Sequence, residues 1–257
     1  MKLVRENINF QKGVDPKTSL SIGRKTLIDK WFKTWAPYVN YEVDDNLNIT
    51  VKGFLYLKDL PVKELPDNLT IKMDLDLEGS KIEKLPDNLT VNGCLDLNKT
   101  SIEKLPKGLI IEKSLYLKET LIKELPNDIS IGGPIDLEGS KIEKLPDNLT
   151  VNGYLDLSKT PIKKLPDNLI INNDLYLNNT FVKELSDNLT VKGSLYLNNT
   201  PIEKLPKGMN IGGNLYLKDS SIKEIPEDII VKGNLYIKGT NIKEIPKSAK
   251  IMGEIIS

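Results

Sequence analysis

The chain repeats itself every twenty residues. Residues 51 to about 250 follow one pattern, approximately V-x-G-x-L-x-L-x-x-T-x-I-x-x-L-P-D-N-L-T. A fixed period of this length indicates a solenoid, because a single coil cannot bury its apolar side chains and must stack on its neighbours. The repeat therefore outweighs the usual expectation of one or two globular domains for 257 residues. The apolar residues that begin the successive units are Val51, Ile71, Val91, Ile111, Ile131, Val151, Ile171, Val191, Ile211, Val231 and Ile251.

The apolar positions within one unit predict a short strand. Leu155 and Leu157 flank Asp156 in the period-two pattern of a strand with one buried face, and stacked copies would form a parallel sheet with about 4.8 Å between coils. Proline and glycine interrupt every potential helix in the repeat. We expect an all-β repeat solenoid, a stack of about ten 20-residue coils with a parallel sheet. The apolar positions of this unit are Val151, Leu155, Leu157, Ile162, Leu165 and Leu169.

Three further positions predict the bends of each coil. A shared glycine position indicates positive φ or close approach between coils. Proline followed by Asp-Asn predicts a turn, and a row of threonines and serines predicts hydroxyls that bond to backbone groups in the bend. The glycines are Gly53, Gly93, Gly133, Gly153, Gly193, Gly213, Gly233 and Gly253. The hydroxyl row is Ser80, Thr100, Thr120, Ser140, Thr160, Thr180, Thr200, Ser220 and Thr240.

Residues 155–166, L-D-L-S-K-T-P-I-K-K-L-P, resemble the leucine-rich-repeat signature L-x-L-x-x-N-x-L-x-x-L-P, with Thr160 in the usual Asn place. The period is similar to that of the short bacterial leucine-rich repeats, so the resemblance implies a leucine-rich-repeat-like fold. Val151-Asn152-Gly153 replaces the first consensus Leu, which favours a straighter, all-β coil. Residues 5–23 are similar to the opening of uncharacterised repeat proteins from tailed bacteriophages and their bacterial hosts. That second resemblance implies an origin, not an activity.

The two ends depart from the repeat. We expect residues 1–50 to form an N-terminal cap and residues 51–257 the solenoid. Mixed spacings of three and four predict an amphipathic helix over about 21–35, ending before Pro37, either as a cover for the first coil or as a docking helix for a partner or membrane. Residues 251–257 begin another coil, whose open strand edge indicates either an end-to-end homodimer or a frayed terminus. The apolar residues of the expected helix are Ile22, Leu27, Ile28, Trp31, Phe32 and Trp35.

Composition excludes several classes of function. Lys+Arg and Asp+Glu both number 36, so no net charge favours nucleic acid or an anionic membrane. The sequence contains no His, which removes Ser-His and Cys-His nucleophile pairs and His-dependent metal sites, and Cys94 is its only cysteine. We therefore expect no enzyme activity, no cofactor and no metal. Charges near Met1 stand where a signal peptide would be apolar, which predicts a cytoplasmic protein, in the host cytoplasm if a phage encodes it.

One outward position lies between the two buried strand residues of each repeat, as Asp156 does between Leu155 and Leu157. From Tyr56 to Tyr236 this row of positions contains only tyrosine and aspartate. Tyrosine offers a large contact area at low entropy cost, and adjacent carboxylates repel one another, so the row favours a binding face for a protein partner over a structural ladder. The first hypothesis is a non-catalytic protein-binding module, encoded by a phage and acting on a host or defence factor. The alternative is a structural or assembly spacer of a virion or oligomer. A carbohydrate-active enzyme is the least favoured class. The candidate binding residues are Tyr176, Tyr196, Tyr216, Tyr236, Asp76, Asp96, Asp136 and Asp156.

Overall fold

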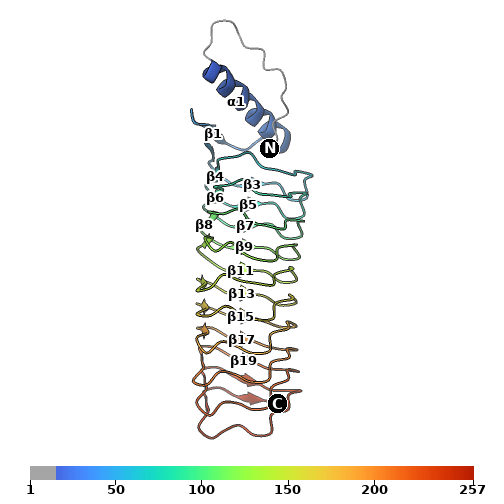
Figure 1. Cartoon of the computed structure of the whole chain (residues 1–257), viewed down its shortest axis with the longest axis vertical. Helices are drawn as coiled ribbons and strands as arrows, with labels where there is room; N and C mark the ends of the chain where they lie inside the picture. The colour runs from blue at the N-terminus through green and yellow to red at the C-terminus, as the bar shows by residue number, and fades with distance from the viewer. Residues whose placement is uncertain (1–15) are drawn as a thin grey trace.

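A computed structural model describes residues 16–257, which form one column of stacked coils with a helix at its N-terminal end (Figure 1). Residues 1–15, and with them most of the segment that resembles phage-encoded proteins, lie outside the described residues. The helix α1 spans Pro16–Trp35, so it begins before the predicted start near residue 21. Proline suits this first helical position because its missing N–H would have no partner there.

The helix covers the first coil with only its C-terminal half. Phe32 is buried and stacks on Tyr41 with ring centroids 3.9 Å apart, and the Trp31 indole N–H donates to the Glu64 carbonyl oxygen at 3.2 Å. Ile22 and Leu27 are exposed, so the prediction that they belong to the buried face was wrong. The reason is the inclination of α1, whose N-terminal half lies away from the coils (Figure 1).

A hairpin completes the cover. The strand β1, Tyr41–Val43, pairs antiparallel with β2, Ile49–Val51. Every later strand of the described chain pairs in parallel with the strand one coil away. The hairpin therefore occupies the edge that β2 would otherwise expose.

The longest wall of the column is an 11-stranded parallel sheet. Its register advances by one repeat per strand, as in Leu155↔Leu175. Its strands are β3 (Leu55–Tyr56), β5 (Leu75–Asp76), β7 (Leu95–Asp96), β9 (Leu115–Tyr116), β11 (Ile135–Asp136), β13 (Leu155–Asp156), β15 (Leu175–Tyr176), β17 (Leu195–Tyr196), β19 (Leu215–Tyr216), β21 (Leu235–Tyr236) and β23 (Ile255–Ile256).

A second wall holds two 6-stranded sheets, one from β1 to β10 and one from β12 to β22. The sequence pattern predicted only the first wall. After β1 and β2, its strands are β4 (Leu69–Ile71), β6 (Thr90–Val91), β8 (Ile110–Ile111), β10 (Ser130–Ile131), β12 (Thr150–Val151), β14 (Ile170–Ile171), β16 (Thr190–Val191), β18 (Asn210–Ile211), β20 (Ile230–Val231) and β22 (Lys250–Ile251).

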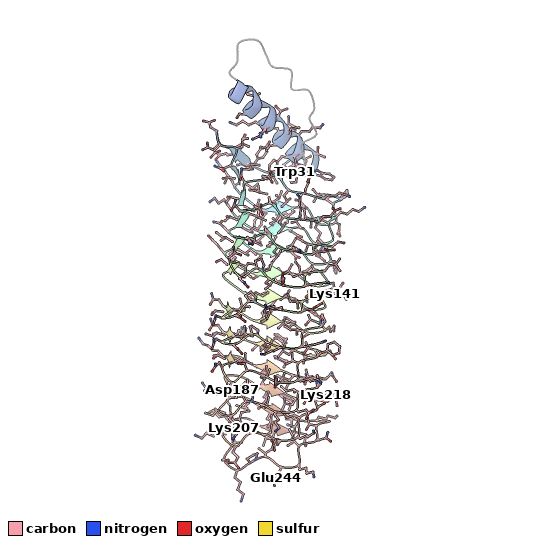
Figure 2. All side chains as sticks on the ribbon, viewed as in Figure 1. Trp31, Lys141, Asp187, Lys207, Lys218 and Glu244 are labelled. Atoms are coloured by element: carbon pink, nitrogen blue, oxygen red, sulfur yellow. The ribbon has the colours of Figure 1, made fainter. Side chains whose placement is uncertain are left out.

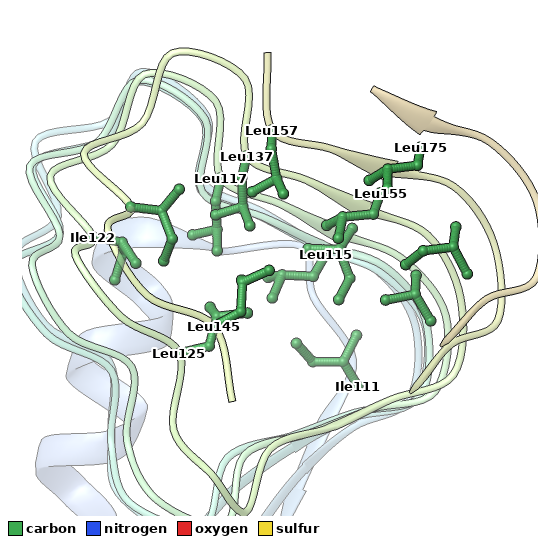
Figure 3. Close-up of a cluster of buried hydrophobic side chains, with 14 of the residues drawn as sticks. Ile111, Leu115, Leu117, Ile122, Leu125, Leu137, Leu145, Leu155, Leu157 and Leu175 are labelled. Atoms are coloured by element: carbon green, nitrogen blue, oxygen red, sulfur yellow. The ribbon is translucent and has the colours of Figure 1, made fainter. Parts of the chain in front are cut away.

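The core is one coil wide and runs the length of the stack. Leu115, Leu117 and Ile122 of one coil are fully buried, and the equivalent leucines of the next coils lie above them in rows (Figure 3). Each coil therefore buries its apolar side chains only against its neighbours. This confirms the predicted fold, a leucine-rich-repeat-like β-solenoid of about ten 20-residue coils with a parallel sheet and an N-terminal helix.

The bends confirm one prediction and correct another. The hydroxyl of Thr160 donates to the Leu157 carbonyl at 2.6 Å, and the other threonines of the row do the same, whereas the buried hydroxyls of Ser80 and Ser220 have no partner in the described chain. Positive φ does not occur at the glycine position of Gly93. It occurs at the position of Gly79 (φ 64°) in every coil and at that of Asn148 (φ 58°) in most.

The far end of the column leaves strand edges at β22 and β23. Met252 and Ile255 are exposed there. Leu215 and Leu235, which occupy the Ile255 position in earlier coils, are buried. The end-to-end homodimer through residues 251–257 stays a prediction. Among the described residues, no helix is both long and apolar enough to cross a membrane.

Candidate functional site

Four tyrosines form a continuous stack on the 11-stranded sheet, which we call the tyrosine ladder: Tyr176, Tyr196, Tyr216 and Tyr236. Successive ring centroids are 4.3 Å apart, with interplanar angles of 13°, 7° and 11°. The strands β15, β17, β19 and β21 set this spacing because each places its tyrosine one strand-to-strand step further along the column. The rings therefore cover one another's faces and present edges and hydroxyls outward.

The ladder begins with an aromatic corner. Tyr154 meets Tyr176 edge to face, with centroids 6.2 Å apart and an interplanar angle of 89°. Its ring thus lies over the start of the ladder, on the side where the row changes from aspartate to tyrosine. Burial raises the pKa of the Tyr154 hydroxyl, with the Asp136 carboxylate as a second cause.

Polar side chains anchor the tyrosine hydroxyls. The Tyr176 hydroxyl donates to Asp174 Oδ2 at 3.2 Å, and the Asn214 amide donates to the Tyr216 hydroxyl at 3.1 Å. Asn234 repeats this contact with Tyr236 at 3.4 Å. Burial is the largest cause that raises the pKa of Tyr176 and of Tyr216, so both hydroxyls remain protonated at neutral pH.

Those same anchors are held by the backbone of the next coil. Asp174 Oδ1 accepts the Ser194 N–H at 2.6 Å, Ser194 Oγ accepts the Asn214 N–H at 3.0 Å, and Asn214 Oδ1 accepts the Asn234 N–H at 2.7 Å. On the other border, Asn178 and Asn198 accept backbone N–H groups in the same way, at 3.1 and 2.9 Å. The ladder thus lies between two rows of side chains with fixed conformations.

The aspartate part of the row has a different arrangement. Asp76, Asp96 and Asp156 each accept the backbone N–H two residues further on, at 3.0, 2.9 and 2.8 Å. Such Asx turns stabilise the bend of the same coil. The tyrosine coils of Tyr116, Tyr196 and Tyr216 use another acceptor. There, the side-chain oxygen of an asparagine in the preceding coil accepts the equivalent N–H.

Asp136 corrects the expectation of a fully outward row. It is only 6% exposed, it accepts the Glu138 N–H at 3.1 Å, and the Lys118 ammonium lies 3.3 Å from its Oδ2. This carboxylate is buried and paired with Lys118, so it is withdrawn from the surface. Asp96 and Asp156 are partly buried as well, and burial raises the pKa of both carboxyls.

Lysines neutralise the acidic region. The carboxylate of Glu78 contacts Lys58 and Lys99, and these two hydrogen bonds lower its pKa to about 2. Glu138 lies 2.7 Å from Lys159 and 3.1 Å from Lys118, whose hydrogen bonds lower its pKa. The middle of the sheet is therefore a mixed ionic network. Sequence reasoning grouped its acids but missed these lysines, which occur one coil before or after the acids they contact.

Among residues 16–257, no group of three or more His, Cys, Asp and Glu side chains is arranged to hold a metal ion. Cys94 is half-buried, and its backbone N–H donates to Asp74 Oδ1 at 2.8 Å. The column carries side chains all around (Figure 2). Lys218, close to the tyrosine ladder, lies on the opposite side of the view from Asp187 and Lys207 (Figure 2). Asp187 and Lys207 belong to the turns that lead into strands β4 to β22 of the second wall, which we call the prolyl turns because a proline precedes all of them except the one after Ser186. The tyrosine wall and the prolyl turns are thus separate surfaces.

Comparisons with known proteins include a similarity to a solved structure. No family model and no curated protein matches the chain. A solved structure of YopM, a leucine-rich effector protein from Yersinia pestis, is similar over 97% of this chain and 96% of that chain, with 15% sequence identity and a TM-score of 0.35. A similarity at this level supports no conclusion about function.

Proposed function

We propose that this protein is a non-catalytic protein-binding module whose contact surface is the tyrosine ladder. The observation that carries the proposal is the unbroken stack of four rings at 4.3 Å, with ordered polar side chains on both borders. Solenoid repeats commonly use such extended walls as binding surfaces. The ladder adds a chemically uniform strip to this wall.

The orientation of the rings supports a protein partner over a carbohydrate. Sugar binding by aromatic residues uses exposed ring faces, and the faces of Tyr196 and Tyr216 are covered by neighbouring tyrosines. What remains outward is a row of ring edges and hydroxyls beside amide groups. Tyrosines that expose both a ring edge and a hydroxyl are enriched in protein interfaces. Stacking already restricts these side chains, so binding a partner costs them little further conformational entropy.

We restrict the proposed contact residues to the tyrosines. Asp76, Asp96, Asp136 and Asp156 were candidates from the sequence, but their carboxylates bond to their own coils, which supports a role in the turns. More specifically, we propose that the partner is a host or defence factor of a bacterial cell. Only the similarity of residues 5–23 to phage-encoded repeat proteins supports that more specific proposal.

The test is a comparison of captured proteins between variants. We expect Tyr196→Ala with Tyr216→Ala to abolish capture of a partner from extracts of the native host cell while the thermal midpoint of unfolding changes little. Tyr38→Ala is the matched control, because Tyr38 is 99% exposed on the cap, far from the ladder in sequence. The captured protein is then identified, purified and titrated against each variant.

The proposal fails if the double variant and the control bind the purified partner with equal affinity. It also fails if binding is lost only in proportion to unfolding, because the ladder then serves stability alone. Circular dichroism of each variant at the temperature of the titration separates these two cases.

A further inference from the structure

The second wall is interrupted at one place in the described chain. Strands β8 and β10 pair, and β12 and β14 pair, but β10 and β12 do not. In the intact part of the wall, the N–H groups of Ile170 and Asn172 donate to carbonyls of the preceding coil, each at 3.0 Å. The equivalent N–H groups of Thr150 and Asn152 make no such bond.

The interruption is local, because the same two coils are joined on either side of it. The Glu143 N–H donates to the Lys123 carbonyl at 2.8 Å before the opening, and the Ile135 N–H donates to the Tyr154 carbonyl at 3.0 Å after it. The opening is therefore framed by rigid contacts. Each of its two edges, β10 on one side and β12 on the other, presents unpaired backbone N–H and C=O groups.

The two coils on either side of the opening differ in turn conformation. Asn148, after Pro146 and Asp147, adopts left-handed backbone with φ 58°. The preceding coil has Asn127 and Asp128 in the opposite order, and Asp128 has no positive φ; its Oδ2 accepts the Gly108 N–H at 3.1 Å. Two successive coils thus enter their strands through different turns, and the strands do not meet.

A second place in the wall supports this cause. Asn188 lacks positive φ and Gly208 of the next coil has φ 68°, and there β16 and β18 retain only the pair Val191↔Ile211. The opposite succession, from Asn168 (φ 56°) to Asn188, keeps both pairs between β14 and β16. Only a change into the left-handed turn weakens the ladder.

A cleft adjoins the opening. Its volume is about 440 Å³, and it lies over the prolyl turns that immediately precede β10 and β12. Ile129, Ile131 and Leu149 beyond these turns are only partly buried, whereas Leu169 and Ile171 at the same positions are fully buried. The lining residues are Lys107, Glu124, Leu125, Pro126, Asn127, Asp128, Lys144, Leu145 and Pro146.

We propose that the opening between β10 and β12 binds an extended segment of a partner protein as an added strand. Both edges offer alternating backbone donors and acceptors at strand spacing, which another extended polypeptide backbone complements. Alternate apolar side chains of the segment would complete the core beside Ile129, Ile131 and Leu149. The rim carries both signs of charge, through Lys107, Lys144, Glu124 and Asp128, so backbone pairing and apolar spacing select the segment, not its charge. This site is independent of the tyrosine ladder.

The chain itself supplies a probe. A fluorescein-labelled peptide of sequence Asp-Asn-Leu-Thr-Val-Asn-Gly, that of residues 147–153, has the backbone length and side-chain alternation of one wall strand. We expect it to raise the fluorescence anisotropy on addition of the protein. A control peptide methylated on the backbone nitrogens of its Thr and second Asn cannot donate to the β10 carbonyls, and should bind at least roughly tenfold more weakly.

A matched variant tests the site itself. Asn127→Asp with Asp128→Asn gives this coil the Pro-Asp-Asn turn of the following coil, in which Asn148 has positive φ, and should close the opening. We expect this variant to unfold at the same or a higher temperature, yet to bind the peptide roughly tenfold more weakly. Hydrogen exchange of the Thr150 and Asn152 amides should be faster than that of Ile170 and Asn172 in the original protein, and should slow when the peptide is bound.

Four results would overturn the proposal. They are no binding of the unmethylated peptide, equal binding of the methylated peptide, equal binding by the reversed-turn variant, and exchange at Thr150 as slow as at Ile170 without peptide. The Tyr196→Ala, Tyr216→Ala variant should retain peptide binding. Its behaviour separates this proposal from the function assigned to the tyrosine ladder.

Discussion

Asp74 Oδ1 accepts a hydrogen bond from the backbone N–H of Cys94, one coil away, at 2.8 Å. The same oxygen lies where a Cβ at Gly93 would have to stand, and the carbonyl carbon of Met73 would be 2.5 Å from that Cβ. At Gly93 the glycine is therefore required by close approach between coils and not by positive φ. The position of the Asp74 side chain and the glycine at residue 93 therefore depend on each other.

This relationship predicts that Gly93→Ala is destabilising. Real Cβ atoms do not approach a backbone carbon this closely, so the two coils must separate, at a cost of about 1–3 kcal/mol. Gly53→Ala is the matched control, because nothing lies within 4 Å of a Cβ at that position. Urea denaturation of both variants measures the difference, and equal midpoints would show that the spacing between coils is not set here.

The unpartnered hydroxyl of Ser220 predicts a stabilising substitution. Threonines at this position donate to the carbonyl three residues earlier at 2.6 to 2.8 Å, whereas the buried Ser220 hydroxyl has no partner in the described chain. Ser220→Thr restricts χ1 and should form this bond, with a gain of about 0.5–1.5 kcal/mol. Calorimetry should show a raised unfolding temperature.

The control for this substitution is Ser140→Thr. The hydroxyl oxygen of Ser140 already accepts the Ile142 N–H at 3.4 Å, so the gain should be smaller. A lower unfolding temperature for Ser220→Thr would mean that the bend has no room for the added methyl group.

The repeat predicted the stack because each apolar row is a local signal repeated many times. Leu155, Leu157 and their equivalents alternate in one strand, and the threonine hydroxyls bond within three residues. Neither feature depends on where other coils lie. The same holds for the exposure of the tyrosine row, which follows from the alternation.

What could not be predicted depends on contacts between coils. The ion pair that buries Asp136 comes from Lys118, eighteen residues earlier and in the preceding coil, so a single repeat does not reveal it. The interrupted wall arises from one pair of adjacent coils with unlike turns. The sequence did contain a signal for those turns. The same turn position holds glycine at Gly108 and asparagine at Asn148, and both residues have positive φ.

Glu78 predicts a stability that falls in acid. Hydrogen bonds from Lys58 and Lys99 lower its pKa from 4.5 to about 2. A carboxyl with a lowered folded pKa contributes stability that is present above the unfolded value and is lost as the pH falls from about 4.5 to about 2. Glu78→Gln should therefore be less stable than the original protein at pH 7. The difference should shrink over that interval and with added salt.

Asp156 predicts the opposite slope. Burial raises its carboxyl pKa above the ordinary 3.8, so the ionised form opposes folding at neutral pH and protonation relieves the penalty as the pH falls. Asp156→Asn retains an oxygen that can accept the Ser158 N–H, which Asp156 now accepts at 2.8 Å, and removes the charge. We expect the variant to be more stable at pH 7, because it lacks the buried charge. The gain should vanish below the unfolded pKa of 3.8. Urea denaturation at pH 7 and pH 3.5 measures both values, and a variant that is less stable at pH 7 would show that the Asx turn requires the charge.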